Sequence, residues 1–261
     1  MKYDAINAKI AGMSAKLLSY DDYLSLCNAG NVYELLAELK YHISYRCISD
    51  DWTSIGSQIS PYLDEDYAKI RCFINDSNIR RYLVNLLIKH RTSSDALHYY
   101  TNLWKDKDRY LSGASKDIAA KIHGTEIDMY NLICIYRLKK NYKPVKEFVY
   151  KHILPINYKL PPEMVSQLVE TDTPAAMREI IQSTCYGKYF GEGDSYSAFY
   201  KALSDVYKRV SYKNTNSIAP IIYYFFRKGM EIKNIVTIFE GVNYSLAPDE
   251  IMDKMRGLNY A

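Results

Sequence analysis

Apolar residues recur along most of this chain with the 3.6-residue period of a helix, not with the strict alternation of a half-buried strand. One such stripe consists of Ile79, Tyr82, Leu83 and Leu86, with basic residues around it. The run 221–226 resembles a strand, but it lies inside a longer uninterrupted segment and is predicted to be a buried helix. The periodicity therefore predicts an all-α protein.

Local signals predict where individual helices begin and end. Thr125, Glu126 and Asp128 predict a helix start, because carboxylates favour the positive end of the helix dipole. Thr173 followed by Pro174 predicts another start, with a capping side chain and a proline at the first helical position. Breaks are predicted at Asn28–Gly30, Ser112–Gly113, Gly187–Asp194, Gly229 and Ala247–Pro248.

Size, composition and charge exclude several classes of protein. The chain has 261 residues, of which 48% are hydrophobic and 25% charged, as in an ordinary globular protein. This composition excludes a disordered chain. The apolar stretch 218–226 is far shorter than the roughly 18 residues that a membrane span needs, and charges near the N-terminus argue against a signal peptide. A net charge of +4 gives no reason to expect a nucleic acid as partner.

Cysteine spacing indicates the redox compartment. The five cysteines lie at least 20 residues apart and include no Cys-x-x-Cys pair, whereas a disulfide framework or a zinc knuckle needs close pairs. We therefore expect reduced, mostly buried thiols in a cytoplasmic protein. The cysteines are Cys27, Cys47, Cys72, Cys134 and Cys185.

Three segments of the sequence place their predicted core residues at the same distances from an asparagine. Each starts at an asparagine, Asn7, Asn131 or Asn234, which is predicted to open a helix with core positions one, four, five and eight residues later. A leucine and a new helix start follow in each segment, and the second segment carries an insertion around residues 142–157. The predicted core positions are Ala8, Ala11, Gly12 and Ala15, then Leu132, Ile135, Tyr136 and Lys139, then Ile235, Ile238, Phe239 and Val242.

The first two segments stay in register further along, with matched residues 142 positions apart. Repeated units of this kind cannot bury their apolar faces alone. We therefore expect three pseudo-threefold-related helical units that pack as one domain over residues 1–261. The matched pairs are Tyr23 with Val165, Leu26 with Leu168, Leu35 with Met177 and Leu39 with Ile181.

The chain lacks the motifs of common catalytic and cofactor-binding sites. Gly187-Lys188 is not part of a phosphate-binding loop, and Gly191-x-Gly193 lacks the third glycine of a dinucleotide fingerprint. No histidine pair has the helical spacing of a metal site, and no cysteine has a recognisable base. We therefore expect no enzyme activity, no cofactor, no metal ion and no small-molecule substrate.

Two features are candidates for partner binding. A basic stretch consists of Arg137, Lys139, Lys140, Lys143 and Lys146, and the turn 187–193 includes Gly187 and Lys188. The basic stretch fits an acidic partner or anionic lipid headgroups, although charge runs are commonly a solvated helix face. Both predictions rest on charge and loop character alone.

Motifs that point to a protein family are spread over nearly the whole chain. Early motifs are Tyr3-Asp-Ala-Ile-Asn7 and Gly30-Asn-Val-Tyr-Glu-Leu-Leu36. Middle motifs are Gly124-Thr-Glu-Ile-Asp128-Met-Tyr-Asn131, Lys159-Leu-Pro-Pro-Glu163 and Cys185-Tyr-Gly-Lys188. Late motifs are Lys233-Asn-Ile-Val-Thr-Ile-Phe239 and Ala247-Pro-Asp-Glu-Ile251. Together these motifs resemble those of the C-type subunits of bacterial and archaeal V/A-type ATPases, whose eukaryotic counterparts are the d-type subunits.

The resemblance implies a funnel-shaped, all-helical rotor protein made of three related units. Such a protein sits on the cytoplasmic face of the membrane rotor ring, receives the central stalk, and couples ATP hydrolysis or synthesis to H⁺ or Na⁺ transport without catalysing a reaction. The expected partners are therefore ring and stalk subunits, with membrane association through the ring. Three alternatives stay open: a helical adaptor with this fold outside a rotary ATPase, a basic nucleic-acid binder and a helical enzyme.

Overall fold

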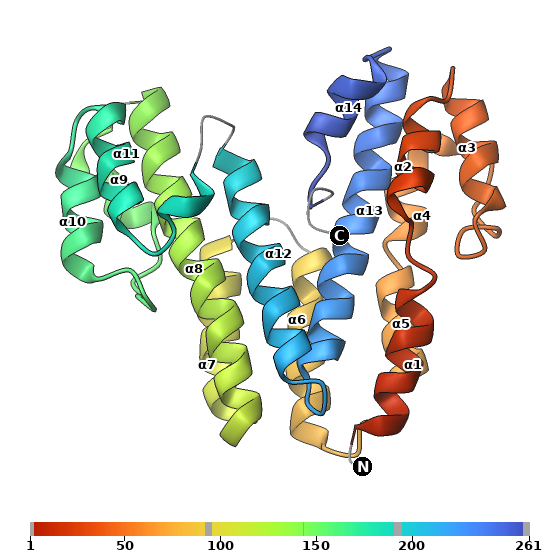
Figure 1. Ribbon diagram of the computed structural model, residues 1–261, viewed down its shortest axis with the longest axis horizontal. Helices are drawn as coiled ribbons and strands as arrows, with labels where there is room; N and C mark the ends of the chain where they lie inside the picture. Colours follow the sequence, from red (N-terminus) through yellow and green to blue (C-terminus); the bar gives the residue numbers. More distant parts are fainter. Residues whose placement is uncertain (1–2, 92–95, 143, 191–194, 258–261) are drawn as a thin grey trace. The chain divides into compact units, whose positions relative to one another are not determined.

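The computed structural model describes residues 3–91, 96–142, 144–190 and 195–257. The chain divides into two compact units, one made of Met1–Arg91 with Asn214–Ala261 and the other of Thr92–Lys213 (Figure 1). Throughout the described ranges the regular elements are α-helices and short 3₁₀ turns, with no strand. The predicted all-α class is confirmed.

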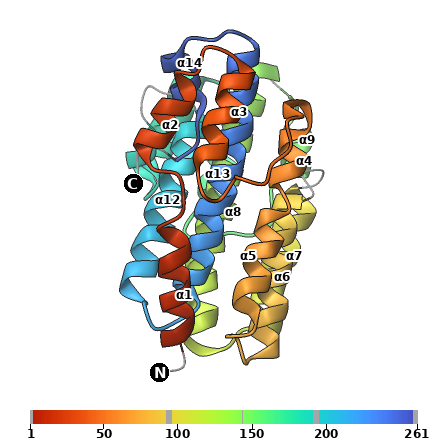
Figure 2. The same cartoon turned by 90° about the vertical axis from the view of Figure 1, so that its right-hand side faces the viewer.

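The first unit is built around one long helix, α13 (Ala219–Asn243). Shorter helices pack along α13, so that most of its side chains are buried, and Figure 2 shows it running behind the chain's first helices. The run 221–226 lies in α13, as expected. The shorter elements are α1 (Asp4–Ser14), α2 (Tyr20–Cys27), α3 (Val32–Tyr41), η1 (Trp52–Ser54), α4 (Ile55–Ile59), α5 (Tyr62–Arg71), α6 (Ser77–Arg91) and α14 (Pro248–Lys254).

The second unit has the same plan around α8 (Gly113–Tyr142). Two helices lie along α8, and a group of short helices packs near its C-terminal end (Figure 1). A core cluster of this unit joins α8 to those short helices through buried side chains such as Leu132, Ile135, Leu168 and Ile181. The other elements are α7 (Ala96–Tyr110), α9 (Lys146–His152), α10 (Pro162–Glu170), α11 (Pro174–Ser183), η2 (Gly187–Tyr189) and α12 (Ser195–Lys213).

Side-chain caps explain several helix starts. Ser19 and Asp22 form a reciprocal capping box at α2, and the Asn31 side chain accepts two backbone N–H groups of α3. Thr173 caps α11, which begins at Pro174, so that predicted start is confirmed. Gly113 has φ +51°, in the left-handed region that favours glycine, and it separates α7 from α8 as predicted.

Two of the boundaries predicted from capping and break signals are wrong. Thr125, Glu126 and Asp128 do not start a helix, because α8 begins at Gly113 and buries all three residues in its middle. Asp128 accepts backbone N–H groups of residues 158–160, and Glu126 accepts the hydroxyl of Tyr207 in α12. Thr125 donates to the Lys121 carbonyl inside α8. Gly229 does not break the chain either, because the apolar residues on both sides of it continue one buried face of α13.

The 142-residue register agrees with the helix bounds. α2 and α10 start 142 residues apart, and both ends of α3 and α11 differ by 142. All four predicted residue pairs are buried. These two helix pairs are called the hairpins below: the α2–α3 hairpin in the first unit and the α10–α11 hairpin in the second.

The core positions predicted for the three asparagine segments are correct in two of the segments. Leu132, Ile135, Tyr136 and Lys139 are buried in α8, and Ile235, Ile238 and Phe239 are buried in α13, with Val242 half-buried. In α1 the predicted positions Ala8, Ala11, Gly12 and Ala15 are exposed, since the helix packs through Ile6, Ile10 and Met13. None of the asparagines opens a helix, because each lies inside one.

Candidate functional site

A buried carboxylate on α8 fixes the chain that leads into the α10–α11 hairpin. Asp128 is fully buried and accepts the backbone N–H groups of Tyr158 at 3.0 Å, Lys159 at 2.6 Å and Leu160 at 3.1 Å. The Tyr186 hydroxyl, which follows the hairpin, donates to the same carboxylate at 2.7 Å. Burial raises the pKa of Asp128, and these hydrogen bonds oppose the rise.

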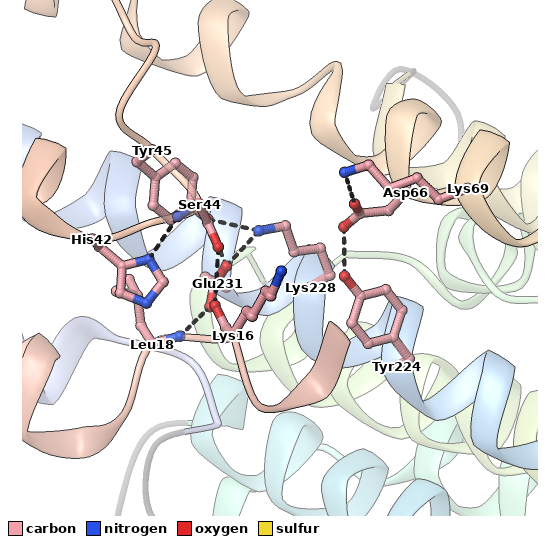
Figure 3. Close-up of polar contacts among 10 residues, drawn as sticks. All are labelled: Lys16, Leu18, His42, Ser44, Tyr45, Asp66, Lys69, Tyr224, Lys228 and Glu231. Carbon is pink, nitrogen blue, oxygen red and sulfur yellow. Dashed lines mark hydrogen bonds and ion pairs between the residues drawn. The ribbon is translucent and has the colours of Figure 1, made fainter. Parts of the chain in front are cut away.

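A second buried carboxylate, that of Glu231, fixes the chain on either side of the α2–α3 hairpin in the first unit (Figure 3). Glu231 of α13 accepts the backbone N–H of Leu18 at 2.6 Å and the hydroxyl of Tyr45 at 2.5 Å. Lys228, also buried, forms an ion pair with Glu231 at 2.6 Å and donates to the Tyr45 oxygen at 2.9 Å. Burial and the Glu231 charge raise the pKa of Tyr45 well above its ordinary value, so this hydroxyl keeps its proton.

Two asparagines clamp the segments that follow the long helices. Asn131 donates to the Leu154 carbonyl at 3.0 Å and accepts the Leu154 N–H at 2.8 Å. Asn234 makes the same pair of bonds with Arg256, at 3.0 and 2.8 Å. These bonds give α9 and α14 equivalent places in the two units, and the two helices lie 102 residues apart in sequence. Residues 142–157, which were predicted to be an insertion, therefore contain the counterpart of α14. Asn7 differs, because its side chain donates to the Thr215 carbonyl.

Neither carboxylate was predicted to form a buried contact, although the sequence contains a signal for both. An acid stands three residues before the asparagine in all three segments, as Asp4, Asp128 and Glu231. In α8 and α13 this spacing turns both side chains toward the packed segments, since residues three apart share a helix face. In α1 the acid is exposed in the first turn. An acid-x-x-Asn pattern is therefore a sequence signal for the buried sites.

Other polar groups pair across helix seams within each unit. His123 and Glu126 are fully buried 2.8 Å apart in α8, and Tyr207 of α12 donates to Glu126 at 2.9 Å. In the first unit, Tyr224 of α13 donates to Asp66 of α5 at 2.5 Å. Tyrosine hydroxyls therefore satisfy buried acids in both units, which gives a structural use to part of the chain's 27 tyrosines.

The predicted basic stretch divides between the core and the surface. Lys139 is buried and donates to the carbonyl of Val169 at the end of α10. Arg137, Lys140 and Lys146 are exposed, and Lys146 lies 3.8 Å from Glu170. The prediction for Lys143 falls outside the described residues. The surface available to a partner is therefore carried by Arg137, Lys140 and Lys146.

The predicted turn at Gly187 and Lys188 has two different parts. Gly187 is buried, and a Cβ there would lie 2.4 Å from the Gln182 carbonyl oxygen, so the chain packs too closely for any side chain. Lys188 is exposed, 3.4 Å from Asp205 of α12. Burial alone would raise the pKa of Asp205, but a Tyr189 hydrogen bond and nearby cations lower it. Residues 191–193 of the predicted turn fall outside the described residues.

The cysteines are free, and the expectation that most are buried is wrong. Cys27 is buried and Cys134 half-buried, and burial raises the pKa of each thiol to about 11. Cys47, Cys72 and Cys185 are exposed. Among the described side chains, no group of three or more His, Cys, Asp or Glu residues is placed to hold a metal ion.

The fold and its buried contacts define a helical protein in which buried carboxylates of two long helices hold short hairpins, and buried asparagines of the same helices hold the segments after α9 and α14. A family model described as ATP synthase (C/AC39) subunit matches residues 96–254, more than half of the chain. The chain belongs to this family of V/A-type ATPase subunits, so it assembles into a rotary ATPase complex. No curated protein matches the sequence. None of the described helices is both long and apolar enough to cross a membrane.

Proposed function

We propose that this protein is a peripheral rotor subunit that links the central stalk to the membrane rotor ring of a V/A-type ATPase. In this role it passes torque between the two and couples ATP hydrolysis or synthesis to H⁺ or Na⁺ transport, without catalysing a step itself. It works on the cytoplasmic face of the membrane and associates with the membrane through the ring. The family match over residues 96–254 is the observation that carries the proposal.

A torque-transmitting protein must resist deformation, and the buried contacts support this requirement. Each long helix is bonded to its hairpin at both ends of the hairpin, through Asp128 in one unit and Glu231 in the other. These bonds cross large sequence separations, so shearing a hairpin away from its helix would leave a buried carboxylate unsatisfied.

We further propose that residues 1–261 act as one domain of the C/AC39 type, with a funnel-shaped, pseudo-threefold architecture. The family match supports this proposal, because residues 96–254 include parts of both compact units. Candidate contacts with ring and stalk subunits are the exposed Arg137, Lys140, Lys146 and Lys188.

Deleting the gene tests the proposed function. The deletion should abolish ATP-driven ion pumping in membrane vesicles, while the soluble sector continues to hydrolyse ATP. Restoring the gene should restore pumping. Coupled pumping that persists in the deletion strain would contradict the proposal.

A further inference from the structure

We propose that the outer face of α9, with the exposed side chains of Lys140, Tyr142 and Val145 before it, forms a docking surface for an acidic, partly apolar segment of another protein of the complex. The inference rests on the proposed function for the kind of partner, another component of the rotary ATPase. The surface, called the α9 surface below, consists of Lys140, Tyr142, Val145, Lys146, Phe148, Tyr150 and Lys151.

Large apolar side chains are unusually exposed on the α9 surface. Tyr142 is 77% exposed and Val145 70% exposed, and Phe148 and Tyr150 are exposed by 43% and 45%. The four lie within nine residues of sequence: Tyr142 ends α8, Val145 immediately precedes α9, and Phe148 and Tyr150 lie on α9, whose inner side is anchored by the buried Val149. Exposed aromatic and aliphatic groups concentrated in so short a stretch of the surface are typical of binding surfaces.

The positive charge of the α9 surface indicates that its partner is acidic. Six of the seven charged residues between positions 137 and 151 are basic. Lys139 serves the fold, but Lys140, Lys146 and Lys151 are exposed beside the apolar side chains. Lysines around aromatic groups are complementary to carboxylates that flank apolar residues.

The second long helix provides an internal comparison. α14 occupies the place of α9, the residue that Asn234 binds follows it as Leu154 follows α9, and it buries Ile251 where α9 buries Val149. Its outward residues differ, since Glu250 and Asp253 stand where α9 has Phe148 and Lys151. The fold therefore accepts acidic side chains at these positions, and packing does not require the aromatic and basic ones.

Acidic groups beside the α9 surface favour a protein over an anionic bilayer. Glu147 is exposed on α9 itself, and Glu170 and Asp172 are exposed at the end of α10, close to Lys146 and Lys139. These carboxylates would be repelled by a sheet of anionic headgroups, whereas a protein segment can place its own charges around them.

Zero-length crosslinking tests the α9 surface. The tagged full-length chain is purified with its partners from native membranes and treated with a carbodiimide, which joins lysine amines to carboxylates. We expect crosslinks from Lys140, Lys146 or Lys151 to aspartate or glutamate residues of another protein in the complex. A crosslink within the chain between Lys146 and Glu170, 3.8 Å apart, is the internal positive control.

A variant tests whether these contacts matter for assembly. Phe148→Glu with Lys151→Asp transfers the α14 residues to α9, and we expect at least tenfold less partner to be recovered. Tyr244→Ser is the matched control, because Tyr244 is the equally exposed counterpart of Tyr142 in the first unit. The melting temperature of each purified variant shows whether it folds. If the double variant does not fold, Val145→Ser is used in its place.

Each outcome has a distinct meaning. Recovery of ATPase subunits with no intersubunit crosslink from α9, and with full recovery by the double variant, would overturn the α9 surface and leave the proposed function standing. Recovery of no ATPase subunit by the wild-type chain would overturn the proposed function. Binding of the purified chain to phosphatidylglycerol vesicles that the double variant loses would identify a membrane surface and overturn the protein partner.

Discussion

Asp128 of α8 and Glu231 of α13 occupy equivalent places in the two units. Each carboxylate accepts the N–H of the leucine before a hairpin, Leu160 or Leu18, and the hydroxyl of the tyrosine after it. Their surroundings differ in one respect. Glu231 has the buried cation Lys228 beside it, whereas the position three residues before Asp128 is Thr125.

Substitution of Asp128 tests the first of these sites. Asp128→Asn replaces one acceptor oxygen with an NH₂ group that faces N–H donors, so we expect the free energy of unfolding to fall by about 1–3 kcal/mol. Urea denaturation of the purified chain measures the change. Asp253→Asn, on the exposed side of α14, is the control and should change stability by no more than about 0.5 kcal/mol. Equal effects of both substitutions would contradict a special role for Asp128.

The raised pKa of Asp128 predicts a pH dependence. The native state holds this proton more tightly than the unfolded state does, so ionisation of Asp128 reduces stability. The loss begins near the unfolded pKa of about 3.9 and is complete above the raised native pKa. The stability difference between wild type and Asp128→Asn should therefore shrink as the pH rises through this interval. A difference that grows with pH would mean that the native pKa is lowered.

The ion pair of Lys228 and Glu231 predicts strong coupling. Lys228→Met leaves Glu231 buried without its cation and should cost about 3–5 kcal/mol. Adding Glu231→Gln should recover part of that loss, which a double-mutant cycle in urea measures. Lys146→Met, at a solvent-exposed ion pair, should cost less than about 1 kcal/mol. Simple additivity of the Lys228 and Glu231 substitutions would show that the two side chains act independently.

Two glycines should respond to alanine in opposite directions. Gly187→Ala places a Cβ 2.4 Å from the Gln182 carbonyl, so the chain must shift and lose stability. Gly12→Ala meets nothing within 4 Å inside α1 and should raise stability by about 0.5–1 kcal/mol. Melting temperatures of the two variants would separate the effects. A neutral Gly187→Ala variant would argue against the tight packing at this turn.

Sequence periodicity predicted the parts of the fold where large apolar residues mark the buried face. The apolar stripes through Leu132 and Ile135 of α8 and through Ile238 of α13 are buried as expected. In α1 the predicted core positions are wrong, because Ala8 and Ala11 are small, whereas Ile6 and Ile10 on another face of the helix bury more apolar surface.

The sites that depend on tertiary contacts were harder to predict. Asp128 was interpreted as a helix-start residue, and it does accept backbone N–H groups, but those of residues 158–160 and not of its own helix. The basic stretch gave no indication that Lys139 would be buried while Lys140 stays exposed. Charge along a sequence does not specify which side chain meets a helix terminus 30 residues away.

Affinity purification from native membranes tests the central claim most directly. The tagged chain is recovered from mild-detergent extracts of cells that contain an assembled V/A-type ATPase, and co-purifying proteins are identified by mass spectrometry. The account predicts rotor-ring, central-stalk and nucleotide-sector subunits in one complex with this chain. Their absence, with the ATPase itself intact in the same extract, would contradict a rotor role and favour a helical adaptor that uses this fold elsewhere.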